Sequence, residues 1–131
     1  MDGNGKKVSV LAVDDSKTML AMMSAYLKGS NFEIVATANN GPEALQKYKE
    51  HKPQLVLLDV VMPEVTGVDT LEQILGNDNG ACVVMVSSLG TEATVQDCLK
   101  KGAKSFVQKP LQKEGMLATL KTVCQEAGVI S

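Results

Sequence analysis

The stretch from residue 54 to residue 67 reads QLVLLDVVMPEVTG. Four apolar residues lead into Asp59, and two valines follow it. A buried carboxylate without a partner is costly, and its pKa rises until the group becomes neutral. We therefore expect Asp59 either to turn outward in a loop or to face a positive charge from another part of the chain.

The apolar run before Asp59 is one of five short runs of this kind. They cover residues 8–13, 33–38, 54–58, 81–86 and 104–107. Apolar residues stand at both odd and even positions, which is typical of strands buried on both faces of a parallel sheet. The runs therefore predict five parallel strands.

Helical patterns occupy the segments between and after these strands. They cover residues 17–28, 42–50, 67–75, 92–101 and 113–127. Ser16 is placed to cap the first helix and Gly29 to end it, and Pro42 suits the first position of the second. Gly76 follows the third helix and Gly102 the fourth. This alternation predicts an α/β fold with one doubly wound, five-stranded parallel sheet and helices on both faces.

Polar side chains follow four of the predicted strands. Asp14 and Asp15 follow the first, Asp59 the third and Ser87 the fourth, and Lys109 stands just beyond the fifth. In an open parallel sheet, sites form outside the carboxyl ends of the strands. If the first and third strands are neighbours, the three carboxylates converge within a few ångström.

Converging carboxylates need counter-charges because like charges resist joint ionisation. Lys109 can supply one, and a hard divalent cation can supply another. An oxygen-rich site of this kind suits Mg²⁺. Each acid alone has an ordinary explanation as a turn residue or helix cap. Their joint position at one edge favours a magnesium site, in which Asp59 faces a metal and an ammonium group.

The composition limits the possible partners. With 44% apolar and 21% charged residues, the 131-residue chain can form a packed core. The net charge is −2 and no basic run exceeds two residues, which argues against a nucleic-acid or anionic membrane surface. No apolar stretch is long enough to span a membrane. We therefore expect no nucleic-acid partner and no membrane partner.

The cysteines and the termini indicate the compartment and the domain bounds. Cys82, Cys98 and Cys124 are odd in number and form no C-x-x-C pair, so we expect free buried thiols in a reducing cytosol. The polar, glycine-rich start is not a signal peptide. We expect a cytoplasmic protein with a disordered tail at 1–6, one domain at 7–127 and a C-terminal tail at 128–131.

Four segments resemble the receiver domain of two-component response regulators, of the small chemotaxis Y type. They are VLAVDDS (10–16), LVLLDVVMPEVTG (55–67), VVMVSS (83–88) and SFVQKP (105–110). The second contains the element D-x-x-M-P-x-x-x-G as Asp59, Met62, Pro63 and Gly67. The resemblance covers about residues 7–127, and it implies a flavodoxin-like (βα)5 fold with strand order 2-1-3-4-5.

The resemblance also implies a role for each polar residue. Asp14, Asp15, Asp59 and the main-chain carbonyl of Val61 would hold Mg²⁺. Asp59 would accept a phosphoryl group from the phosphohistidine of a sensor histidine kinase or phosphotransfer protein, while Lys109 neutralises charge on the phosphoryl oxygens. Such a domain is not an enzyme for outside substrates, and it catalyses its own phosphorylation and dephosphorylation.

A switch in partner binding is the further implication. Ser87 would bond a phosphoryl oxygen, Phe106 would swing inward, and the face of the fourth helix, fifth strand and fifth helix would change its affinity for a downstream target. A plain core aromatic is the alternative explanation for Phe106. The sequence departs from the usual pattern with Ser87 for Thr, Ser88 for Ala and Phe106 for Tyr. By the same resemblance, Val61 and Ser88 would flank the path of water to the acyl phosphate and so influence its lifetime.

Two other functions fit parts of the pattern. An Asp-nucleophile phosphatase of the haloacid dehalogenase class needs an acid two residues after the nucleophile, where Val61 stands. A flavin-binding module needs a phosphate-cradling loop after the first strand, where Asp14 and Asp15 would repel phosphate.

No effector domain follows, so we expect one of three kinds of protein. They are a stand-alone regulator, with chemotaxis as a candidate pathway, a phosphorelay intermediate, and the receiver part of a larger regulator. The segment VMVSSLG (84–90) is similar to receivers attached to chemotaxis methylesterases.

Overall fold

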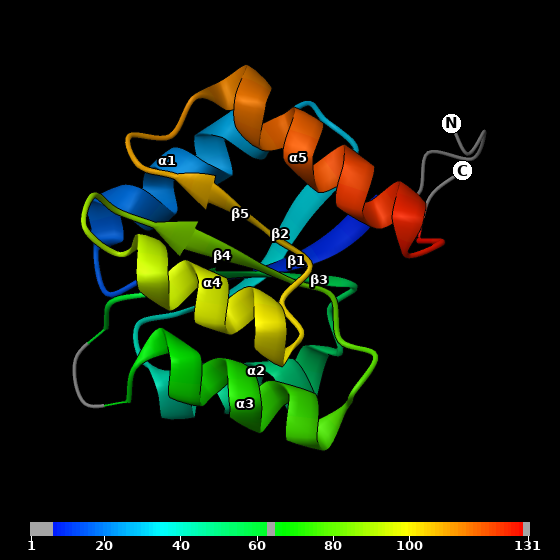
Figure 1. The fold of residues 1–131 in the computed structure, drawn as a ribbon. Helices are drawn as coiled ribbons and strands as arrows, with labels where there is room; N and C mark the ends of the chain where they lie inside the picture. The colour runs from blue at the N-terminus through cyan, green and yellow to red at the C-terminus, as the bar shows by residue number, and fades with distance from the viewer. Residues whose placement is uncertain (1–6, 63–64, 130–131) are drawn as a thin grey trace.

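Strands and helices alternate along the chain in the computed structural model, which describes residues 7–62 and 65–129 (Figure 1). The elements are β1 (Val8–Val13), α1 (Lys17–Leu27), β2 (Phe32–Ala38), α2 (Gly41–His51), β3 (Leu55–Asp59), α3 (Gly67–Asn77), β4 (Val83–Ser87), α4 (Glu92–Lys101), β5 (Ser105–Gln108) and α5 (Lys113–Glu126). This confirms the predicted α/β fold. The expected tail at 1–6, Pro63 of the sequence element and residues 130–131 lie outside the described residues.

The strands form one parallel sheet in the order β2-β1-β3-β4-β5, which confirms the predicted order. The register pairs Val13 with Leu58, and Asp59 with Val86. Because all strands run the same way, their carboxyl ends meet at one edge. Asp59 and Ser87 are the last residues of β3 and β4, whereas the sequence patterns placed each of them just after its strand.

Helices cover both faces of the sheet, and each face has its own apolar cluster. In Figure 1, α1 and α5 lie on one face, and α2, α3 and α4 lie on the other. Met23 of α1 and Leu120 of α5 belong to the first cluster. Leu71 of α3 and Val95 of α4 belong to the second. None of the helices in the described part of the chain has the length and apolar character that a membrane span requires.

The two edge strands correct one expectation. β1, β3 and β4 are buried on both faces, as predicted, except for the half-buried Ser9. β2 alternates buried or half-buried residues with exposed ones, and only Val107 of β5 is buried. A strand at the edge of the sheet has helices over only part of its surface, so its outward side chains reach solvent.

Side chains cap the starts of α1, α2 and α3 but not those of α4 and α5. Ser16 accepts a hydrogen bond from the amide of Met19 at 3.2 Å, as predicted for the start of α1. The prediction that α3 stops before Gly76 was wrong, because the helix continues through that glycine to Asn77. Asp78 takes the cap position, where its carboxylate accepts hydrogen bonds from Tyr48 Oη at 2.9 Å and the Gly80 amide at 3.0 Å.

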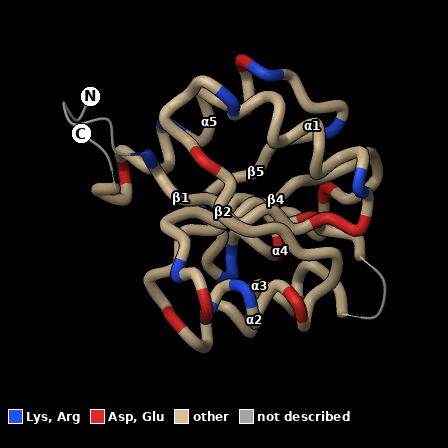
Figure 2. The backbone as a smooth tube through the Cα atoms, turned by 180° about the vertical axis from the view of Figure 1, so that it is seen from behind, with Lys and Arg blue, Asp and Glu red and all other residues tan. Residues whose placement is uncertain are grey.

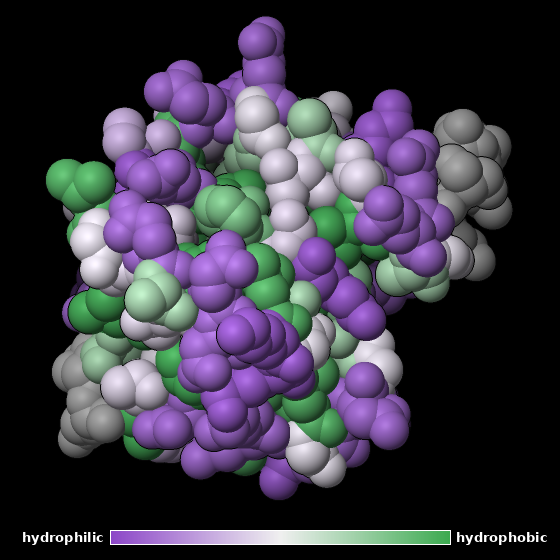
Figure 3. Space-filling model, in the orientation of Figure 1, coloured by the Kyte–Doolittle hydropathy of each residue, from purple (hydrophilic) through white to green (hydrophobic). Residues whose placement is uncertain are grey.

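The surface carries mixed charges. Figure 2 shows lysines interspersed with acidic residues along the backbone. In Figure 3, hydrophilic side chains gather over α4 in the middle of the face that is shown, and Gln96, Asp97 and Lys100 of this helix are exposed.

The three cysteines are Cys82, Cys98 and Cys124. They are free and buried, which confirms the expected state of the thiols.

Candidate metal centre at the ends of the strands

Three carboxylates converge at the edge of the sheet where the strands end. Asp14 and Asp15 follow β1, and Asp59 ends the neighbouring β3. One carboxylate oxygen from each lies within 4.8 Å of the others. Asp14 is fully buried and Asp59 is 3% exposed, whereas Asp15 is exposed. The structure therefore brings the three acids together and makes the two adjacent aspartates unequal.

Asp14 is held by the backbone around it. Its amide donates a hydrogen bond to the Ala38 carbonyl at the end of β2, at 3.1 Å. Its Oδ1 accepts from the amide of Ser16 at 2.9 Å. Its buried Oδ2 has no hydrogen-bond partner among the described residues, although the Lys109 ammonium lies 3.1 Å away. That oxygen is thus ion-paired with Lys109, and a carboxylate oxygen keeps further lone pairs with which to bind a metal ion.

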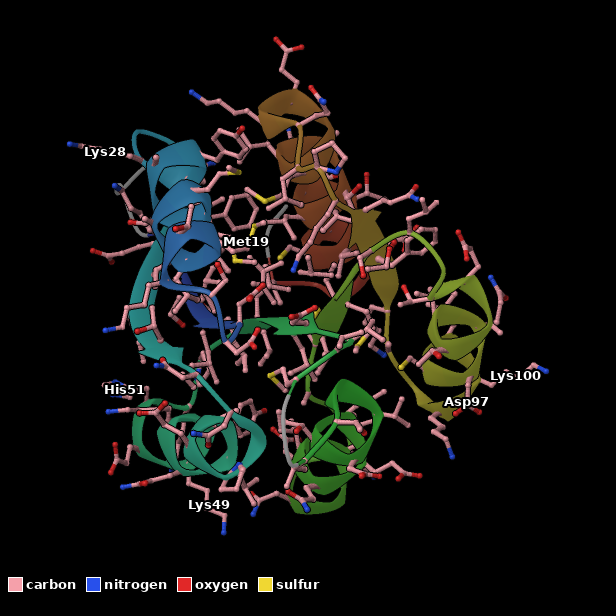
Figure 4. All side chains as sticks on the ribbon, turned by 90° about the vertical axis from the view of Figure 1, so that its left-hand side faces the viewer. Met19, Lys28, Lys49, His51, Asp97 and Lys100 are labelled. Atoms are coloured by element: carbon pink, nitrogen blue, oxygen red, sulfur yellow. The ribbon has the colours of Figure 1, made fainter. Side chains whose placement is uncertain are left out.

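Among the described residues, Lys109 is the lysine that forms ion pairs with Asp14 and Asp59. Its amide donates to the Ser87 carbonyl at 2.7 Å, which fixes the backbone beside the end of β4. Its Nζ lies 3.1 Å from Asp14 Oδ2 and 3.6 Å from Asp59 Oδ1. The side chain is 22% exposed, so part of it is shielded from water. Figure 4 looks onto this edge, and the labelled Lys28, Lys49 and Lys100 point away from it at the periphery.

The pKa of Asp59 is raised from 3.8 to about 6. Burial is the largest cause, and the negative charge of Asp14 adds to it. The Lys109 ammonium and a long hydrogen bond from the Val61 amide to Oδ1, at 3.4 Å, lower the pKa and only partly offset these effects. Asp59 is therefore largely ionised near neutral pH, at a cost to the folded state.

This pKa predicts that the protein loses stability as the pH rises from about 4 to about 6. In that window the folded state keeps a proton that the unfolded state releases, so the free energy of unfolding falls with pH. Asp59→Asn cannot ionise, and it should be more stable than the wild type near pH 8 by about 2 kcal/mol. Urea unfolding of both proteins in chelator across this range measures the slope. If the free energy of unfolding had the same pH dependence in both proteins, the assignment of that dependence to Asp59 would be contradicted.

Ser87 and Phe106, the two predicted switch residues, differ in their exposure to solvent. Ser87 is 4% exposed, and its Oγ donates a long hydrogen bond of 3.4 Å to the Val107 carbonyl, which leaves the hydroxyl weakly engaged. Phe106 is 41% exposed, so the alternative of a plain core aromatic was wrong. Val61 exposes 56% of its surface. Its carbonyl as a metal ligand stays a prediction, as do the roles of the other site residues.

The donor set fits Mg²⁺. Three carboxylates within mutual reach offer hard oxygen ligands, and the buried Asp14 Oδ2 accepts no hydrogen bond from the described residues, although it pairs with Lys109. Mg²⁺ prefers such oxygen ligands together with several waters, and the exposed Asp15 keeps one side of the cluster open. Among the described residues, this is the cluster of acids close enough to hold a metal ion.

Sequence reasoning missed a feature of the loop after β4. Thr91 Oγ1 accepts a hydrogen bond from the Ser88 amide at 3.1 Å and donates one to the Ser88 carbonyl at 2.7 Å. The loop is closed on itself in this way, and the Thr91 side chain does not cap α4. A hydroxyl three residues after Ser88 was the available signal, because threonine commonly forms such local bonds.

The comparisons with known proteins agree with this geometry. Residues 10–121 match the family model of the response regulator receiver domain. The chain is 45% identical over 113 residues to the chemotaxis protein CheY of Listeria monocytogenes, covering 86% of this chain and 95% of that protein. It is also 47% identical over 108 residues to the protein-glutamate methylesterase/protein-glutamine glutaminase of Bacillus licheniformis, covering 79% of this chain and 29% of that protein.

A solved structure has the same fold. A chain in the crystal structure of the CheX-CheY-BeF3-Mg2+ complex from Borrelia burgdorferi superposes with a TM-score of 0.88 at 38% identity. The match covers 94% of this chain and 93% of that chain.

Proposed function

This chain belongs to the response regulator receiver family, and from that membership we propose that Asp59 accepts a phosphoryl group from a histidine kinase or phosphotransfer protein. The observation that carries the proposal is the position of the Lys109 ammonium, 3.1 Å from Asp14 and 3.6 Å from Asp59, at the edge where the acids converge. A nucleophilic carboxylate beside fixed positive charge is what phosphoryl transfer requires.

In the transfer step, a carboxylate oxygen of Asp59 attacks the phosphorus of the donor phosphohistidine. The new O–P bond forms an acyl phosphate, the P–N bond breaks, and the donor imidazole leaves with the electron pair. The raised pKa of about 6 still leaves Asp59 mostly ionised at neutral pH, which is the nucleophilic state. Hydrolysis later returns the carboxylate and inorganic phosphate.

The surrounding residues stabilise the charge that moves in this step. Lys109 faces the incoming phosphoryl oxygens, because its ammonium already lies beside Asp59. Ser87 can leave its long bond to the Val107 carbonyl and donate to a phosphoryl oxygen instead. Mg²⁺, held by Asp14, Asp15, Asp59 and the Val61 carbonyl, would supply further positive charge against those oxygens.

The output we propose is a change in partner binding rather than turnover of an outside substrate. The movement of Ser87 would draw in the loop before α4, and the exposed Phe106 on β5 would turn inward. The face formed by α4, β5 and α5 would then change its affinity for a downstream target. Similarity to CheY supports chemotaxis as the pathway. A reducing cytoplasm is the compartment we propose, and the free buried cysteines support it.

Labelling of the purified chain tests the proposal. Incubation with phosphoramidate and Mg²⁺ should add one phosphoryl group, detected by intact mass, and chelation of the metal should prevent it. Borohydride reduction of the acyl phosphate should locate the label at Asp59. A label on another residue would contradict the assignment, and sustained hydrolysis of a chromogenic phosphate ester would instead favour a phosphatase.

Mg²⁺ should stabilise the folded protein through the same residues. At ten times the dissociation constant, a metal that binds only the folded state raises the free energy of unfolding by about 1.4 kcal/mol. Asp15→Asn should lose most of this gain in stability, because it removes one of the three carboxylate ligands. Asp15 is exposed, so the substitution disturbs no packing of the core. Asp97→Asn on the outside of α4 is the matched control and should keep the gain (Figure 4). Urea unfolding with and without Mg²⁺ measures it, and an undiminished gain in Asp15→Asn would count against the site.

A further inference from the structure

Gly67 touches the backbone of the residue that carries the proposed phosphoacceptor. It is the buried first residue of α3, and its amide donates to the Val60 carbonyl at 3.0 Å. A Cβ at this position would lie 2.7 Å from Val60 Cα, 2.8 Å from the Val60 oxygen, and in direct collision with the carbonyl oxygen of Asp59. These are backbone atoms, which cannot swing aside as a side chain does.

The requirement for glycine here is one of space. Gly67 does not have the positive φ that Gly29, Gly90, Gly102 and Gly128 adopt. An alanine could therefore take the same backbone angles, and its only difficulty would be the methyl group against β3. The absent side chain lets the start of α3 press directly on the end of the strand.

A second glycine, at the start of α2, also lies in close contact with the start of α3. Gly41 is the buried first residue of α2, and a Cβ there would lie 2.5 Å from Thr70 Oγ1 and 2.8 Å from Cβ and Cγ1 of Val65. Thr70 is fully buried, and its hydroxyl donates to the Thr66 carbonyl at 2.9 Å, one turn earlier in α3. Figure 1 shows α2 and α3 side by side on the same face of the sheet.

The first turn of α3 is itself well fixed. Thr66 caps the helix by accepting a hydrogen bond from the Asp69 amide at 3.2 Å. The start of α2, the first turn of α3 and the end of β3 thus lie in succession with two close contacts between them, each made possible by a missing side chain. We expect a displacement at either contact to reach Asp59, because close-packed atoms transmit strain.

We propose that Gly67 is a positioning residue for Asp59, and that Gly41 supports it through α3. The proposal rests on the function assigned to Asp59. By allowing α3 to abut the carbonyl side of Asp59 and Val60, Gly67 sets the distance of the Asp59 carboxylate from Asp14 and Lys109. A methyl group at Gly67 pushes this segment away from α3, and it disturbs the metal ligands and the nucleophile together.

Three alanine variants test the proposal, with Mg²⁺ affinity followed by NMR titration and labelling followed with phosphoramidate. Gly67→Ala should raise the Mg²⁺ dissociation constant at least tenfold, within the roughly 10- to 100-fold typical of lost support around metal ligands. Its labelling rate at saturating Mg²⁺ should fall about 10²-fold, as expected for a misplacement near 1 Å. Gly41→Ala should show a smaller change in the same direction, because its clash is with side chains. Gly76→Ala has no atom within 4 Å of the new methyl, and both quantities should stay within about twofold.

A fourth variant separates positioning from loss of stability. Thr66→Ala removes the α3 cap and should lower the free energy of unfolding by about 1 kcal/mol without placing an atom against Asp59. If Thr66→Ala weakens Mg²⁺ binding as much as Gly67→Ala does, the positioning role is overturned. If Gly67→Ala does not fold, Gly41→Ala decides, and an unchanged dissociation constant there overturns the proposal. A wild type that binds Mg²⁺ but takes no label refutes the proposed function alone, and one that binds no Mg²⁺ refutes both.

Discussion

Asp59→Asn is expected to abolish labelling by phosphoramidate and by acetyl phosphate. The amide keeps the size of the carboxyl group, so the packing around the buried end of β3 is preserved, but it has no anionic oxygen to attack phosphorus. The loss should be complete within detection, because covalent transfer has no route that bypasses the nucleophile. Intact mass after incubation with Mg²⁺ is the measurement.

Two controls accompany this loss: a substitution of another acid, and the stability of the Asp59→Asn protein itself. Asp97→Asn removes an exposed carboxylate on α4 and should be labelled at the wild-type rate. The Asp59→Asn protein itself should unfold at a higher urea concentration than the wild type near neutral pH, which excludes misfolding as the cause. A phosphoryl group that still appears on Asp59→Asn in an acyl linkage would place the acceptor elsewhere.

Lys109→Ala should slow labelling by about 10²- to 10³-fold, the usual effect of removing one preorganised charge from a transition state. The ammonium lies 3.1 Å from Asp14 and 3.6 Å from Asp59, and no second described lysine pairs with either acid. The variant should still bind Mg²⁺, since all three carboxylates remain. It should also respond poorly to beryllofluoride, because the charge that draws the phosphoryl mimic into place is missing.

Lys104→Ala is the matched control, since Lys104 is an exposed lysine just before β5 and has no ion pair among the described residues. Its labelling rate should equal that of the wild type. Initial rates at saturating Mg²⁺ compare the two variants, so a difference in metal affinity does not enter. A Lys109→Ala rate within threefold of the control would remove Lys109 from the transfer step.

Much of the fold follows from local signals in the sequence. Apart from Ser9, the central strands β1, β3 and β4 are apolar or end in a polar residue, and they proved to be buried on both faces, because two helical layers cover this part of the parallel sheet. Ser16 marked the start of α1 correctly and Pro42 marked that of α2 to within one residue, since a cap and a fixed φ act within one turn. The convergence of Asp14, Asp15 and Asp59 followed from the common direction of the strands.

Other features depend on distant parts of the chain, and the sequence patterns missed them. The exposure of Phe106 follows from the place of β5 at the sheet edge, which no local pattern of four residues reveals. α3 continues past Gly76 because Asp78, fixed by Tyr48 of α2, provides the stop. The difference between buried Asp14 and exposed Asp15 arises because neighbours in a turn point in different directions.

The two outer strands carry a consequence for the behaviour of the protein at high concentration. An uncovered strand edge is a template on which a second copy can add its own strand, and this is a common route to aggregation. β5 is only four residues long, β2 places the charge of Glu33 on its surface, and the pairing of β2 with β1 is irregular between Val10 and Leu11. Short length, charge and an irregular ladder each discourage the addition of a strand from a second copy. Both edges of the sheet can therefore face solvent without pairing with another molecule.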